Sequence, residues 1–283
     1  MILIFKKILF IYINSKLNSK KNFSYLDLNF RKIDFTNHDK VKSFIFKKKF
    51  YTLKNKSIHN FDFLNFSNKL GGKIGISLSK EAIFGWYKLY KNKLGFPWIG
   101  DLPSKRLINL LYNYEYINSS SKENDKKKLD FIIYFHIQRI LFECKSKKIT
   151  EFSSYDLIAY LLSFSLLNKI NDKEIEYIKF VVDSQIDKIG LHKSYNLLEH
   201  SKFINNLKEI KNILLFFKSN KSSIFDETIL KMMSTLNEYF HVDGSIPLFN
   251  GANNIYTMNI YNSLNKESYL KKREFSNINN GIA

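Results

Sequence analysis

The sequence predicts an all-α protein built from pairs of antiparallel helices, and three observations lead to this class. From His59 onward, apolar residues recur with the period of a helix. Short polar breaks, the clearest over 119–125 and 219–223, separate the helical stretches. Hydrophobic residues make up 45% of the 283 residues, which is enough to bury helix against helix in a core.

The first 57 residues have a different character. The stretches 25–30 and 44–46 alternate apolar and polar residues between basic loops, a pattern typical of short strands. We expect residues 1–57 to form an N-terminal arm of short strands or irregular structure.

The first predicted helices surround a glycine pair. Apolar and amide residues after His59 precede Gly71-Gly72, which signals a helix stop. Ser79 is the expected cap of a helix over 80–93, and Pro103-Ser104 opens the next helix. Five further helical stretches are predicted over 129–144, 154–169, 172–189, 202–218 and 225–240.

The chain carries a formal charge of +19. Such a charge favours a polyanionic partner, and one alternative is a basic protein that binds nucleic acid or an anionic surface. The lysines are scattered, however, and the richness in Lys, Asn, Ile, Phe and Tyr is typical of an A+T-rich coding sequence. We therefore predict no specific nucleic-acid partner.

The cysteine and histidine residues limit which disulfides, metal sites and cofactor sites this chain can form. The single cysteine, Cys144, excludes an intrachain disulfide and a cysteine-based zinc cluster. No histidine spacing with carboxylate support and no glycine-rich phosphate loop is present, so we expect neither a metal nor a cofactor. His136 reads as a core histidine and His200 as an exposed one. The apolar run 8–13 is too short to span a bilayer, and no transmembrane segment is predicted.

The most informative stretch is 241–251. Asp243-Gly244 and Asn250-Gly251 are turn dipeptides, because Asp, Asn and Gly tolerate left-handed backbone. A loop that carries His241, Asp243 and Asn250 beside a Phe is one way to build a wall of a carbohydrate cleft. The alternative is a polar turn that closes a helix.

Four segments in order resemble the heparinase II/III-like proteins of alphaproteobacteria. The segment 59–64 resembles a His-x-Phe-Asp-Trp-Leu string with Phe63 in place of Trp, and Trp98 with 104–107 resembles a Trp before a Ser/Arg-Leu helix start. The segment 190–197 resembles Gly-Gly-His-x-Ser-Arg-Asn-Pro, with Leu191, Tyr195 and Leu197 as departures. The segment 243–251 resembles Asp-Gly-x-x-x-Leu-Phe-Asn-Gly.

The resemblance implies an incomplete (α/α) toroid over 58–251, in which helical hairpins circle a cleft. In that family a β-sandwich follows and supplies a catalytic histidine. We therefore expect residues 252–283 to be a linker toward a β-sandwich that this chain lacks, and a separate chain or domain to supply it. The resemblance also implies a location in the cell envelope or periplasm, although a cytoplasmic one stays open.

Members of the family with known activity are polysaccharide lyases, which cleave uronic-acid-containing chains by β-elimination. The resemblance thus implies a carbon-oxygen lyase acting on an acidic polysaccharide, with a non-catalytic glycan-binding toroid as the alternative. Catalysis needs a group that neutralises the uronate carboxylate, a base and an acid. His192 and Asn196 occupy the matching motif, and on a helix they would share one face.

Tyr195 stands at the motif's Arg and is a candidate base. The alternative for His192 and Asn196 is a loop histidine and a helix-capping asparagine. Sugar-binding roles fall to six further residues, namely His59, Asp62, Trp98, His241, Asp243 and Asn250.

Overall fold

The computed structural model describes residues 49–52, 54–93, 95–167, 170–239, 247 and 250. Helices account for 76% of this part of the chain, and no strand occurs in it, so the all-α class is confirmed there. One isolated antiparallel bridge joins Ile186 and His192. The predicted arm up to residue 48 and the predicted linker 252–283 lie outside the described residues.

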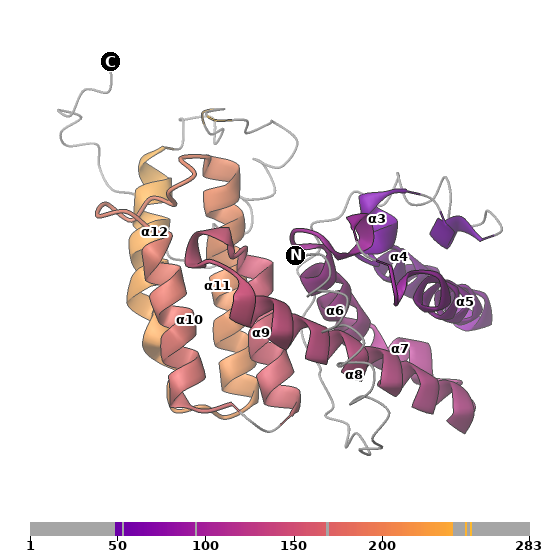
Figure 1. The fold of residues 1–283 in the computed structure, drawn as a ribbon. Helices are drawn as coiled ribbons and strands as arrows, with labels where there is room; N and C mark the ends of the chain where they lie inside the picture. Colours follow the sequence, from indigo (N-terminus) through magenta and orange to yellow (C-terminus); the bar gives the residue numbers. More distant parts are fainter. Residues whose placement is uncertain are drawn as a thin grey trace, which may run out of the picture. The chain divides into compact units, whose positions relative to one another are not determined.

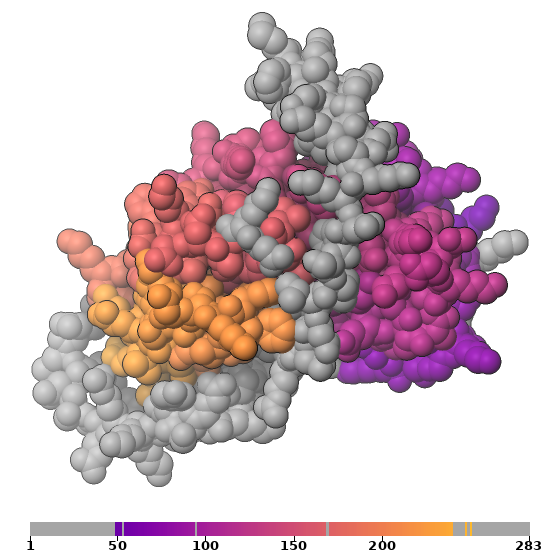
Figure 2. Space-filling view, turned by 90° about the horizontal axis from the view of Figure 1, so that it is seen from below, coloured from indigo at the N-terminus to yellow at the C-terminus, as the bar shows by residue number. Residues whose placement is uncertain are grey.

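The chain divides into two compact units, Met1–Asn171 (unit 1) and Asp172–Ala283 (unit 2). The boundary falls inside the range 58–251 for which the family resemblance implies one toroid domain, and we describe each unit by itself. Figure 1 traces unit 1 from indigo to magenta and unit 2 from salmon to orange. Figure 2 shows the same units in a space-filling view, with the same colours.

The described part of unit 1 begins with a 3-10 turn, η1 (Phe50–Thr52), and the short helices α3 (Lys56–His59) and α4 (Phe63–Leu70). Gly71 ends α4 with a φ of 69°, a left-handed conformation that glycine adopts without steric cost, so the predicted helix stop is confirmed. The next helix, α5 (Gly72–Tyr90), begins at once. Ser79, the predicted cap, instead lies buried inside α5, so that prediction is wrong.

Helix α6 (Leu102–Tyr112) is the centre of unit 1, because it contacts α3, α4, α8 and α9. A 3-10 turn, η2 (Phe96–Trp98), leads into it, and α7 (Tyr114–Asn118) follows it. The sequence predicts Leu107, Leu110 and Leu111 on the inward face of this helix, and all three are buried.

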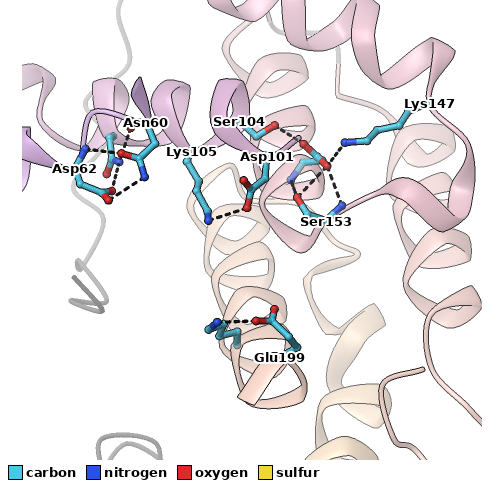
Figure 3. A network of polar contacts seen from close by, with 11 residues as sticks. Asn60, Asp62, Asp101, Ser104, Lys105, Lys147, Ser153 and Glu199 are labelled. Carbon is cyan, nitrogen blue, oxygen red and sulfur yellow. Dashed lines mark hydrogen bonds and ion pairs between the residues drawn. The ribbon is translucent and has the colours of Figure 1, made fainter. Parts of the chain in front are cut away.

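Helices α8 (Glu123–Ser146) and α9 (Ser154–Leu166) complete unit 1, joined by the 3-10 turn η3 (Ile149–Glu151). Ser153 and Asp156 form a capping box at the start of α9. The Asp156 carboxylate also accepts hydrogen bonds from Ser104 on α6 and Lys147 after α8, both at 2.5 Å (Figure 3). This buried carboxylate therefore ties three parts of unit 1 together.

The described part of unit 2 consists of α10 (Asp172–Ser184), α11 (Leu197–Phe216), η4 (Ser222–Phe225) and α12 (Asp226–Glu238). The helices run side by side (Figure 1), and α11 packs against α12. Lys179 on α10 donates a hydrogen bond to Thr228 on α12 at 3.1 Å. Within the described ranges of both units, no helix is both long enough and apolar enough to cross a bilayer.

Candidate functional site

The loop between α10 and α11, residues 185–196, contains the predicted site residues His192, Tyr195 and Asn196. The Asp187 carboxylate accepts hydrogen bonds from the amides of Ile189 at 3.0 Å and Leu191 at 2.8 Å. Gly190 has a φ of 95° and approaches α12 so closely that an added Cβ would lie 2.8 Å from Lys231 Cγ. The 185–196 loop therefore has a fixed shape set by its own carboxylate and by α12.

His192 lies half-buried in this loop, with its ring 4.9 Å from that of Phe203. Its Nδ1 accepts a hydrogen bond from the Ser194 amide at 3.2 Å and lies 2.8 Å from Ser194 Oγ. Because Nδ1 accepts, the neutral ring carries its proton on Nε2. Burial lowers the pKa of His192 below its usual value, so the ring is neutral near pH 7 and offers an Nε2–H donor.

Asn196 is the N-cap residue of α11. Its Oδ1 accepts a hydrogen bond from the Glu199 amide at 3.0 Å, as expected for a helix cap. Its Nδ2 donates to the backbone oxygen of Asn250 at 2.7 Å. The expectation that His192 and Asn196 share a helix face is wrong, because both precede α11; the alternative of a loop histidine and a capping asparagine describes them.

Tyr195 has the most unusual backbone of the loop. Its φ is 51°, in the left-handed region that costs a tyrosine about 1 kcal/mol or more, and its side chain is 51% exposed. Its amide donates to His192 O at 2.8 Å, and its carbonyl accepts from Asn250 Nδ2 at 2.8 Å. Strained backbone beside an exposed aromatic ring is common at ligand-binding sites.

The side chains of Asn196 and Asn250 thus bond each other's segment, although the residues are 54 positions apart. The structure brings together four of the predicted site residues in unit 2: His192, Tyr195, Asn196 and Asn250. His241 and Asp243 lie outside the described residues.

Two predicted sugar-binding residues of unit 1 lie in its interior. The side chain of His59 is 1% exposed, and its Nδ1 accepts a hydrogen bond from Trp86 Nε1 at 2.9 Å. Trp98 is 5% exposed and donates to Tyr90 O at 2.9 Å. A sugar could not contact either side chain in this conformation, so we assign both to the core, against the prediction.

Both residues contact Arg106, a residue that the sequence reasoning missed. Its side chain is fully buried, and its guanidinium carbon lies 4.0 Å from the ring centre of Trp86 and 4.3 Å from that of Trp98. The head group donates to His59 O, to Pro97 O at 3.0 Å and to His136 Nε2 at 2.9 Å. Two indole faces and three acceptors therefore stabilise this cation where bulk water is absent.

Burial lowers the pKa of Arg106 well below its usual value, and the nearby Arg139 lowers it further. Burial and Arg106 also lower the pKa of His136, which is neutral. His136 accepts through Nε2 and donates through Nδ1 to Ile132 O at 2.8 Å, so it is the core histidine that the sequence predicts. In the sequence, the sign of this buried group around Arg106 is an arginine that stands among the apolar residues of α6.

Asp62 is the one predicted unit 1 site residue that is half-buried. Its carboxylate accepts hydrogen bonds from Asn60 Nδ2 at 2.8 Å and Asn109 Nδ2 at 3.1 Å (Figure 3). Burial raises the pKa of Asp62, while the two amides and the Lys105 ammonium act in the opposite direction. Lys105 itself pairs with Asp101 at 2.7 Å.

A row of asparagines continues from Asp62 between α4 and α6. Asn113 is fully buried; it donates to Asn65 Oδ1 at 3.1 Å and accepts from Asn68 Nδ2 at 3.0 Å. Asn65 in turn donates to Asn109 Oδ1 at 3.3 Å. The row satisfies its own amides, so these residues join the two helices rather than present free groups to a ligand. Their spacing of three and four residues was the sequence signal.

The described residues contain no group of three or more His, Cys, Asp or Glu side chains able to hold a metal ion. Comparisons with known protein families, with curated proteins and with solved structures find no match to this chain. The candidate site therefore depends on its geometry and on the motif resemblance alone.

Proposed function

We propose that this chain is a polysaccharide lyase-like protein of the heparinase II/III type that binds a uronic-acid-containing polysaccharide at the 185–196 loop. In this proposal its helical hairpins belong to an incomplete (α/α) toroid, and it acts in the cell envelope. The supporting observation is the reciprocal contact of Asn196 and Asn250. It joins two segments that resemble the family's motifs, 190–197 and 243–251, and His192 and Tyr195 belong to the first of them.

The chemistry of the loop fits a carboxylated sugar. The Nε2–H of a neutral His192 donates a hydrogen bond to a uronate carboxylate, which makes the C5 proton of the sugar more acidic. Tyr195 presents an exposed phenol that can stack on a sugar ring or move a proton. Both polar atoms of Asn196 are engaged in the fold, so we reassign this residue from catalysis to holding the loop.

Because both polar atoms of Asn196 are already hydrogen-bonded within the fold, a second candidate is favoured, a glycan-binding module without turnover. β-Elimination needs three groups, and the described part of the 185–196 loop offers a donor and a phenol. A binding module needs only the donor and an aromatic surface. The two candidates share a ligand and differ in whether a product forms.

The test compares the full chain with His192→Ala and with Ser223→Ala, an exposed control residue elsewhere in unit 2. Each protein is incubated with alginate, heparin and polygalacturonate, with dextran as the neutral control. Ultraviolet absorbance of the unsaturated uronate that is lost in His192→Ala alone supports the lyase. Saturable binding that needs His192 but yields no product supports the binding module.

Two results contradict both candidates. One is a failure to bind any of the three uronate polymers. The other is binding that falls steeply with salt and does not prefer these polymers over DNA, which is the behaviour of a general polyanion binder.

A further inference from the structure

His200 lies in the first turn of α11, and its side chain is fully buried, contrary to the sequence prediction of an exposed residue. Its Nδ1 accepts a hydrogen bond from the His192 backbone amide at 3.1 Å. Its Nε2 lies 2.9 Å from the Met232 carbonyl on α12. Because Nδ1 accepts, Nε2 carries the proton and donates to Met232.

The ring of His200 thus links three parts of unit 2: the 185–196 loop, α11 and α12. We propose that His200 is a positioning residue that holds the His192 backbone, and with it the loop, in the conformation that receives the glycan. The inference rests on the proposed function of this loop, and it adds a residue that is too deeply buried to contact the ligand.

The hydrogen bonds of the ring show that His200 does more than fill space in the core. A phenyl ring could fill a similar volume, but it would leave the His192 amide and the Met232 carbonyl without their partner. A polar group that is buried without a partner is costly, so the segment would rearrange to reach water. The first segment able to move is the loop, because α11 and α12 are held by their own hydrogen bonds and by packing against each other.

Protonation of the His200 ring is a second way to break the hydrogen bond from the His192 amide to Nδ1. Burial lowers the pKa of His200 to about 4, and the titratable groups that face it are His192 and Asp187, with the Met232 carbonyl on the α12 side. A protonated Nδ1 can no longer accept from the His192 amide. The hydrogen bond is therefore present near pH 7 and absent once the ring is charged.

Two variants of similar shape each keep one of the two hydrogen-bonding groups of the His200 ring. His200→Asn keeps an acceptor at the position of Nδ1 and loses the donor to Met232. His200→Gln keeps a donor at the position of Nε2 and loses the acceptor for His192. If His200 positions the loop, the Asn variant retains the loop conformation and the Gln variant does not.

The experiment measures amide hydrogen exchange over 192–196 and affinity for alginate in the full chain and in both variants. We expect His200→Gln to exchange faster in the loop and to bind alginate about tenfold more weakly, the effect of one lost hydrogen bond on binding, with His200→Asn close to the wild type. Equal exchange and equal affinity in the two variants would overturn the inference.

A measurement on the unmodified protein covers the case in which the variants fail to fold. The amide chemical shift of His192 should follow the titration of the His200 ring, and a shift that ignores that titration overturns the inference. Wild-type protein that fails to bind alginate would instead contradict the proposed function, while loop exchange and the amide shift still decide the role of His200.

Discussion

Acidification should destabilise unit 2 through His200, and the magnitude follows from the burial of its ring. The ordinary pKa of histidine is 6.5, and burial lowers that of His200 to about 4 in the folded protein. Each unit corresponds to about 1.4 kcal/mol, so the difference amounts to about 3 kcal/mol. The unfolded chain binds the proton more readily. The stabilisation is therefore complete above pH 6.5 and is lost as the pH falls from 6.5 to 4.

The assay must report on unit 2 alone. Both tryptophans, Trp86 and Trp98, lie in unit 1, so their fluorescence does not follow unit 2. Hydrogen exchange of the α11 amides in urea gives the free energy of unfolding of the segment that carries His200. Between pH 7 and pH 4 the wild type should lose about 3 kcal/mol more than His200→Asn. Parallel losses in the two proteins would refute the reasoning.

Three further changes have outcomes that the structure predicts. Arg106→Lys removes the stacking of the guanidinium on Trp86 and the hydrogen bond to His136. It should lower the free energy of unfolding of unit 1 by about 3 kcal/mol, measured by tryptophan fluorescence in urea. An unchanged urea midpoint contradicts this. Gly75→Ala places a Cβ 2.2 Å from Tyr116 Oη. The same assay should therefore show a free energy of unfolding lower by about 1 to 3 kcal/mol, in spite of the higher helix propensity of alanine. A higher free energy of unfolding would contradict this. Tyr195→Gly removes a left-handed tyrosine and should slow α11 exchange, a stabilisation of about 1 kcal/mol; faster exchange would show that the backbone is unstrained.

The helices could be predicted because their apolar periodicity is local. The ends of helices were less predictable, since they depend on capping contacts. The sequence starts one helix at Ser79 and another at 202, whereas α5 begins at Gly72 and α11 at Leu197. In the second case the sequence offers Asn196 both as a catalytic candidate and as a helix cap, and the structure shows the cap.

The site was predictable only in part, because its decisive contacts are long-range. Motif resemblance selects Asn196 and Asn250, but only the fold shows that their amides bond each other's segment. The same resemblance selects His59 and Trp98, and the sequence cannot show that both lie in the core in contact with Arg106. A buried cation is stabilised by groups from several helices, so a single helical stripe does not reveal it.

The central claim is that a uronate polymer contacts the 185–196 loop. The most direct test is hydrogen exchange of the full chain with and without alginate oligosaccharides, read at each peptide. We predict slower exchange over 192–196 when the oligosaccharide is bound, and a smaller decrease in His192→Ala. Unchanged exchange in this loop, with alginate bound elsewhere or not at all, would contradict it.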